Sequence, residues 1–124
     1  MATRKFSSIS VATTLASSIS SVATSATVAT ATGNALLGGV VLTTGDQFTV
    51  AIDPDTANEE IVFVTAQATD VLTITRGRAG TSNIAHSAGA SVKHVLTSDD
   101  LNAFEAGLDG SAGGIVSSLM LMGG

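Results

Sequence analysis

The sequence predicts a mainly β protein: a small antiparallel β-sandwich or barrel with one short C-terminal helix and extended termini. Between residues 46 and 95, apolar side chains recur at every second position in several segments, so each strand can bury one face. Near residue 97, hydroxyl side chains and two aspartates precede the best helical pattern. The predicted parts are a Ser/Thr/Ala-rich N-terminal arm or strands (1–32), a β module (33–96), a short helix (97–108) and a Gly-rich apolar C-terminal tail (109–124).

The composition indicates a protein that associates with other subunits. Five Lys and Arg residues against ten Asp and Glu give a net charge of −5, which makes the chain a poor partner for nucleic acid. Charged residues are 12% and aromatic residues 3% of the chain, so large core-forming side chains are scarce. There is no Cys, which excludes disulfides and thiolate metal sites. A surface with so little charge favours burial against other subunits.

Residues 1–32 consist mainly of Ser, Thr and Ala with scattered Val and Ile, and strands are favoured here over coil. Residues 13–19 and 26–30 can pair as a hairpin. A helix over residues 11–19 fits the apolar spacing, but the density of Ser and Thr disfavours it because these side chains compete for backbone hydrogen bonds. The same polarity argues against a secretory signal. Phe6 lies in a terminus that needs packing to be ordered, so we expect it at a subunit interface.

The β module is expected to contain four strands with short connections. The apolar run at residues 61–64 suits a central strand or one covered by a neighbouring subunit. Residues 66–70 are expected to form a hairpin connection, and residues 33–45 a loop or short strand. Two glycines after the third strand, Gly77 and Gly80, allow a sharp reversal with positive φ. The strands are expected at residues 47–52, 60–65, 71–75 and 91–95.

The polar residues of the β module are expected to be structural. Glu60 and Arg76 are expected to form a cross-strand pair, because the fork of an Arg side chain can bond carboxylate and carbonyl oxygens together. His86 is also expected to be structural, since a metal site would need further ligands. The turn after the first strand is a weak calcium candidate that lacks the glycine and the distal glutamate of a calcium loop, so a solvated turn is favoured. This candidate consists of Asp53, Asp55, Asn58 and Glu59.

No group of residues in the sequence converges on a catalytic arrangement. The sequence RGRAGT contains glycines but lacks the Gly-Lys-Ser/Thr ending of a phosphate-binding loop, and no helix is predicted directly after it. We therefore expect neither an enzyme nor a cofactor.

The C-terminal helix has recognisable start and stop signals. Thr97 or Ser98 can cap it, and Asp99 and Asp100 meet the positive end of its dipole in the first turn. Gly107 is expected to end the helix. The apolar stripe consists of Leu101, Phe104 and Leu108.

The tail after the helix contains an apolar run at residues 115–122 that carries no charge. This run is too short to span a bilayer, which takes about 20 residues. An uncharged apolar segment would be a liability on a soluble monomer, so we expect an interface element, such as a strand added to the sheet of a neighbour. The expected interface residues are Phe6, Ile115, Val116, Leu119 and Leu121.

Three segments, EEIVFVT, LTITRGRAGT and HSAGASVKHVLT, follow one another at short spacings. Together they resemble a module of tailed-bacteriophage structural proteins of the minor tail, baseplate and fibre type. The resemblance covers roughly residues 46–106 and includes the patterns TRGxxGT and AHxAGxxV and a following DLN helix. It implies a small oligomeric β domain of the virion without enzymatic activity. It implies that His86 stabilises a turn. The residues that we expect to be structural are Glu60, Arg76, Gly77, Gly80, His86 and Gly89.

We therefore expect a virion protein that assembles in the host cytoplasm as a homo-oligomer through strand edges and apolar termini. A trimer is favoured, and contacts with other virion proteins are expected. A tail, baseplate or fibre-attachment role is favoured because the resemblance implies it. A capsid decoration (cement) protein is the alternative. A module that binds host-surface glycans is a third class, which the absence of Trp and Tyr disfavours because such sites stack sugars on these rings.

Overall fold

The computed structural model describes the backbone of residues 3–111 and the side chains of residues 3–105. The described chain is mainly β with one C-terminal helix, as the sequence predicts. Its elements are β1 (Thr3–Lys5), β2 (Thr13–Thr14), β3 (Ser25–Thr27), α1 (Gly33–Leu37), β4 (Asp46–Ile52), β5 (Glu60–Ala68), β6 (Val71–Arg78), β7 (Ser91–His94) and α2 (Ser98–Ser111).

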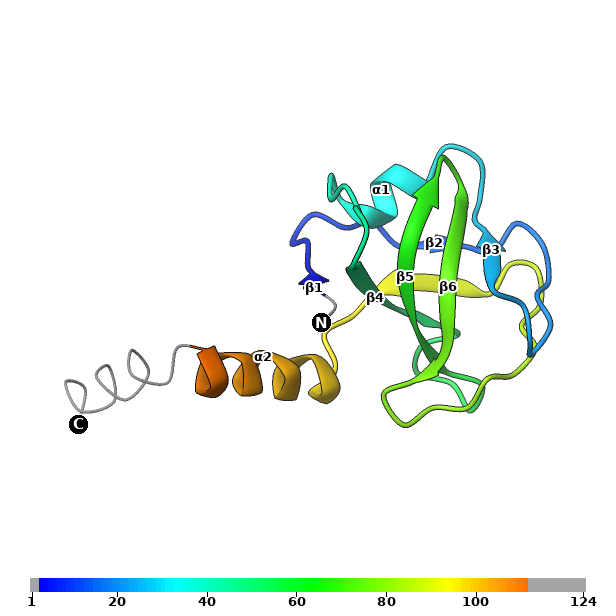
Figure 1. Ribbon diagram of the computed structural model, residues 1–124. Coiled ribbons are helices and arrows are strands. Elements are labelled where there is room, and N and C mark those ends of the chain that lie inside the picture. Colours follow the sequence, from blue (N-terminus) through cyan, green and yellow to red (C-terminus); the bar gives the residue numbers. More distant parts are fainter. Residues whose placement is uncertain (1–2, 112–124) are drawn as a thin grey trace.

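The strands form one curled sheet in the order β2-β7-β4-β5-β6-β3 (Figure 1). All neighbours on this path are antiparallel, while β1 runs parallel to the start of β4. The two ends of the sheet are linked by an antiparallel bridge between Leu15 and Val28, just beyond β2 and β3. Backbone hydrogen bonds of 2.9 Å flank the bridge on both sides. The sequence predicts a β-sandwich or a barrel, and the single curled sheet is closer to the barrel.

The core fills the inside of the curled sheet. The run Ile61–Val64 is buried on both faces of β5, which lies between β4 and β6, so the prediction of a central strand is confirmed. Phe48 is fully buried on β4. The alternation that predicts one exposed face is wrong for β4, where every residue from Gln47 to Ile52 is buried. The reason is that the chain covers both faces; for example, the side chain of Thr49 contacts Asp100 at the start of α2.

The segment predicted as a loop or short strand contains a helix instead. α1 buries Leu36 and Leu37 and ends at Gly38 with a left-handed φ of 57°. The carboxylate of Asp70 fixes its start by accepting hydrogen bonds of 3.0 Å from the N–H groups of Ala31 and Gly33. This anchor comes from the turn between β5 and β6, which the local sequence of α1 cannot reveal.

The predicted N-terminal hairpin is largely wrong. Only the Leu15–Val28 bridge joins its two halves, because β2 pairs with β7 and β3 pairs with β6. β1 pairs with β4 of its own chain, so this terminus has a partner within the same subunit.

Several boundaries also differ from the prediction. β5 continues to Ala68, so the connection to β6 is reduced to the turn Thr69–Asp70. α2 begins after Thr97 as predicted but runs through Gly107 to Ser111, three residues into the predicted tail. A glycine inside a helix costs only about 1 kcal/mol relative to alanine, so it does not end the helix by itself.

We expect the bridge between the sheet ends to be important for stability. Leu15 is 2% exposed, so Leu15→Ala should lower the free energy of unfolding by about 2–5 kcal/mol, because it removes buried methyl groups and leaves a cavity. Val22→Ala is the matched control, since Val22 is 77% exposed and its truncation should change stability by less than about 0.5 kcal/mol. Urea unfolding measures both. Equal losses would contradict a closing role for Leu15.

Candidate functional site

The most polar cluster inside the sheet is centred on Glu60, the first residue of β5. Its side chain is fully buried, and Arg76 on β6 binds it with both arms of the guanidinium. Nε of Arg76 donates to Oε2 and Nη2 donates to Oε1, each at 2.8 Å. Such a bidentate pair combines geometric specificity with a charge-assisted hydrogen bond. The predicted cross-strand pair is therefore confirmed.

An irregularity in β6 brings the backbone to the same carboxylate. Ile61 pairs with Arg78 and Phe63 with Thr75, so β6 has one more residue than β5 in this interval. Gly77 lies in this interval with a φ of 59°, and its N–H donates to Oε2 of Glu60 at 2.9 Å. The extra residue at such a bulge re-aims the strand. The positive φ expected of Gly77 is confirmed, as it is for Gly80 (83°). The predicted reversal, however, begins only after Arg78, because Gly77 lies inside β6.

His86 links Glu60 to the opposite end of the β4–β5 connection. Its Nε2 lies 2.9 Å from Oε1 of Glu60, and its Nδ1 lies 2.8 Å from Oδ2 of Asp53. The side chain of His86 is fully buried. The backbone of His86 also exchanges two hydrogen bonds with Ile19, so the ring is fixed from both ends.

Arg76 extends the cluster to the N-terminal segment. Its Nη1 donates to the carbonyl oxygens of Ser20 at 2.7 Å and Ala23 at 3.0 Å, and its Nη2 also reaches the carbonyl of Ile84. One side chain therefore joins β6 to two loops that have no regular structure of their own. This is the local structural role that the sequence predicts for Arg76.

The cluster lowers the pKa of Glu60 to about 2. Burial alone would raise this pKa, but hydrogen bonds from Arg76, His86 and the N–H groups of Gly77 and Ile84 stabilise the ionised carboxylate and outweigh it. All of these donors are protein groups, and both carboxylate oxygens are engaged. The arrangement is that of a structural cluster, since its charges are used to hold chain segments together.

The weak calcium candidate is not assembled by the structure. The carboxylate of Asp53 faces His86, and Glu59 accepts a hydrogen bond from the N–H of Asp55 at 3.3 Å. Among the residues that the structure describes, no three His, Cys, Asp or Glu side chains are grouped as metal ligands. Among the four candidate residues, Asp53 is the one whose side chain binds a residue elsewhere in the fold, His86. Nothing in the sequence indicates this pair, because the two residues are 33 positions apart.

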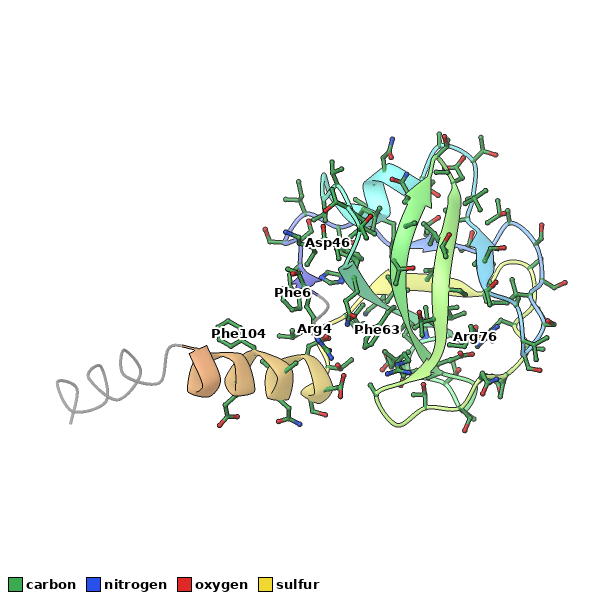
Figure 2. The ribbon with its side chains drawn as sticks, viewed as in Figure 1. Arg4, Phe6, Asp46, Phe63, Arg76 and Phe104 are labelled. Carbon is green, nitrogen blue, oxygen red and sulfur yellow. The ribbon has the colours of Figure 1, made fainter. Side chains whose placement is uncertain are left out.

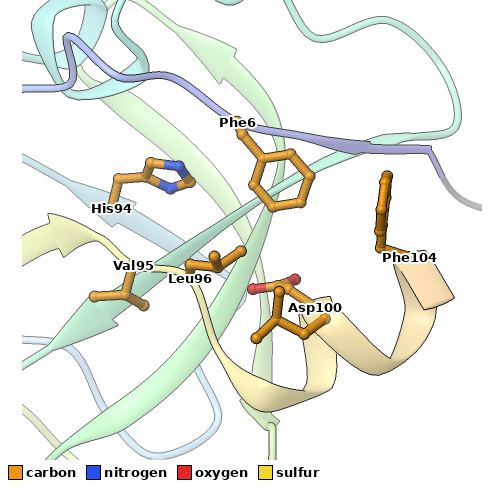
Figure 3. Close-up of a pocket in the computed structure, with 7 residues that line it drawn as sticks. Phe6, His94, Val95, Leu96, Asp100 and Phe104 are labelled. Carbon is orange, nitrogen blue, oxygen red and sulfur yellow. The ribbon is translucent and has the colours of Figure 1, made fainter. Parts of the chain in front are cut away.

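A second site is a pocket between the barrel and α2, with a volume of about 330 Å³. Phe6 points into it from the segment after β1, with His94 to one side and Phe104 of α2 to the other (Figure 3). Arg76 and Phe104 lie on opposite sides of the barrel in Figure 2, so this pocket is separate from the Glu60 cluster. The lining residues are Phe6, His94, Val95, Leu96, Asp100, Leu101 and Phe104.

One wall of the pocket lies where β1 and β7 meet, because both strands pair with the same edge of β4. His94 bridges them: its Nε2 accepts a hydrogen bond from the N–H of Ser7 at 3.4 Å, and its Nδ1 lies 2.6 Å from the carbonyl oxygen of Thr49. The ring also stacks on Phe48 with centroids 3.9 Å apart. His94 is thus a fixed part of the pocket wall, held by Ser7, Thr49 and Phe48.

Asp100 attaches α2 to the barrel at the base of the pocket. Its Oδ1 accepts hydrogen bonds from Arg4 at 2.6 Å and Thr49 at 2.9 Å, and its Oδ2 accepts from both the N–H and the hydroxyl of Thr97 at 3.0 Å. Burial alone would raise the pKa of Asp100, but the hydrogen bonds from Thr97, Arg4 and Thr49 hold it below its ordinary value. Thr97 caps the helix in return, since its hydroxyl accepts from the N–H of Asp100.

The structure brings together four of the six predicted structural residues, and the predicted interface is only partly described. Gly80 and Gly89 lie apart from the Glu60 cluster, in the turn after β6 and the turn before β7. Phe6 is 43% exposed at the pocket. The expected interface residues Ile115, Val116, Leu119 and Leu121 lie outside the described residues. Sequence reasoning missed the role of Arg4 and the binding partners of His94, because these partners are more than 40 positions away and leave no local pattern.

No protein-family model matches the sequence, and no curated protein is significantly similar to it. Within the described part of the chain, no helix has the length and apolar character needed to cross a membrane.

Arg76 should be a main support of the fold, because it is the cation that pairs with the buried Glu60. Arg76→Met should lower the free energy of unfolding by about 3–5 kcal/mol, because it leaves a buried carboxylate without its cation. Arg78→Met is the matched control on the same strand: Arg78 is exposed, with its guanidinium 5.2 Å from the Phe63 ring, and its loss should cost about 0.5–1 kcal/mol. Chemical denaturation distinguishes the two. Similar losses would mean that Arg76 is not a central support.

Acid should lower the stability of the folded chain through the protonation of Glu60. The pKa of Glu60 is lower in the folded chain than the ordinary value of 4.5, so the folded state binds this proton less readily than the unfolded state. The contribution of Glu60 should be complete above pH 4.5 and should disappear as the pH falls towards about 2. Urea midpoints measured across this range should therefore decrease steeply for the wild type. For Glu60→Gln the decrease should be shallower, and parallel curves would exclude Glu60 as the titrating group.

Proposed function

We propose that this protein is a structural component of a tailed-bacteriophage virion, in a tail, baseplate or fibre-attachment position. It assembles in the host cytoplasm as a homo-oligomer, with a trimer favoured, and contacts other virion proteins. The observation that carries this proposal is the apolar surface around α2.

α2 projects from the barrel instead of packing along it (Figure 1). Its first turn is anchored through Asp100, but Leu101 is 53% and Phe104 61% exposed. Phe6 and Leu96 beside them are 43% and 60% exposed. These four side chains border one pocket and form a contiguous apolar surface. Such a surface on a small protein is typical of an interaction site.

The residues that carry the phage-protein resemblance support a structural function. Glu60, Arg76, Gly77 and His86 meet in the buried cluster, where they bind each other and the backbone. The motif therefore stabilises this barrel, and its groups are used within the chain. This use suits a protein whose task is mechanical, and it agrees with the low charge and the scarcity of aromatic residues.

A capsid decoration protein is the alternative, because an apolar face with a projecting helix would also suit attachment to the shell of the head. A host-glycan module remains the weaker third class: the pocket contains Phe6 and Phe104, but the chain has no Trp or Tyr for sugar stacking.

The test is to locate the chain in purified virions by cryo-electron microscopy. We expect density for the barrel at the tail, baseplate or fibre attachment, with the side formed by β1 and α2 buried against other chains. Density at the local three-fold positions of the shell would favour the decoration protein instead. A particle that lacks the chain, verified by mass spectrometry of the same preparation, would contradict both structural roles.

A further inference from the structure

We propose that the pocket beside Phe6 binds residues 115–122 of a neighbouring copy of this chain. This inference rests on the proposed oligomer and specifies how one copy contacts the next. The apolar run after α2 of one copy is the inserted segment, and it enters the pocket of the next copy.

The lining of the pocket selects an uncharged apolar occupant. Six of its seven lining residues are apolar or aromatic, His94 included. The seventh is Asp100, whose two oxygens are already engaged by Arg4, Thr49 and Thr97. A charged occupant would lose its hydration without gaining a partner there. An aliphatic segment would replace water against Phe6, Leu96 and the other apolar walls.

The sequence contains one segment of this kind next to the pocket-forming helix. After Ser111 the chain continues for 13 residues (124 − 111), and residues 115–122 read IVSSLMLM without a charge. The helix α2 itself is a poor occupant of a neighbour's pocket. It carries Asp99, Asp100 and Glu105 and has no basic residue in its last turn, so two copies of it would repel each other.

The direction of α2 favours a neighbouring copy as the source of this segment. Leu101 and Phe104 line the pocket, whereas Ser111 lies seven residues beyond Phe104, which is about 10 Å further along the helix. α2 leads away from the barrel (Figure 1). To return to its own pocket, the chain would have to reverse within residues 112–114. The direction of α2 therefore favours the pocket of a neighbouring copy.

This contact fixes the kind of symmetry. The pocket and the inserted segment are different surfaces, and each copy has one of each, so the contact is heterologous. Heterologous contacts form closed rings when the rotation closes, and a ring of three copies agrees with the favoured trimer. It also leaves the edges of the curled sheet free of any role in this contact.

Two full-length variants test the contact by complementation. Leu96→Glu places a charge in the pocket at a side chain that is 60% exposed, so the barrel should still fold. The double variant Leu119→Glu/Leu121→Glu places charges in the inserted segment. Val22→Glu is the matched control, because Val22 is 77% exposed and does not line the pocket. Circular dichroism confirms that every variant folds, and light scattering after size-exclusion chromatography measures the mass.

We expect the wild type and Val22→Glu at a multiple of 12.2 kDa, with three favoured, and each pocket or segment variant alone near 12.2 kDa. An equimolar mixture of the two variants should contain pairs of about twice 12.2 kDa, because one intact pocket meets one intact segment. A monomeric wild type, or a mixture that stays monomeric, would overturn the inference; the first result is the one expected if each segment occupied its own pocket.

The outcomes also separate this inference from the proposed function. An oligomer that neither variant disrupts would overturn the pocket contact and leave a virion role intact, since other surfaces would then hold the copies together. Complementation by a protein that is absent from virions would support the contact and overturn the virion role.

Discussion

The ionised carboxylate of Glu60 inside the barrel is the constraint on which most of the structure depends. A buried charge is tolerated only when partners replace the lost hydration. These partners are Arg76, His86 and two backbone N–H groups, and they come from segments that have few other reasons to meet. Satisfying Glu60 therefore fixes the bulge in β6, the loop that contains His86 and, through Arg76, the loop before β3.

The same device recurs at two other places in the chain. Asp70 holds the start of α1, and Asp100 joins α2 to the barrel, in each case through hydrogen bonds to N–H groups of the backbone. The pKa of each of these carboxylates is below its ordinary value, as it is for Glu60. In a chain with few aromatic residues, hydrogen-bonded carboxylates position segments that a larger protein would fix by packing bulky side chains.

Local patterns predicted the parts of the fold that depend on local sequence. Period-two alternation located β4 to β7, glycines marked the positive φ angles, and the Glu60–Arg76 pair could be predicted because both residues belong to adjacent strands. Sequence alone could not assign partners to the short strands β2 and β3, which contain two and three residues. It also missed α1, whose start depends on Asp70, and the contact of Arg4 with Asp100, which are 96 positions apart.

The place of β7 in the sheet has a consequence for the order of folding. β7 is the last strand of the described residues, yet it lies between β2 and β4. The sheet can close only after the ribosome has released residues beyond His94, and the chain must first lose the entropy of large loops. Until then β4 has an open edge that can pair with other nascent chains. Slow closure of the sheet is therefore built into this strand order.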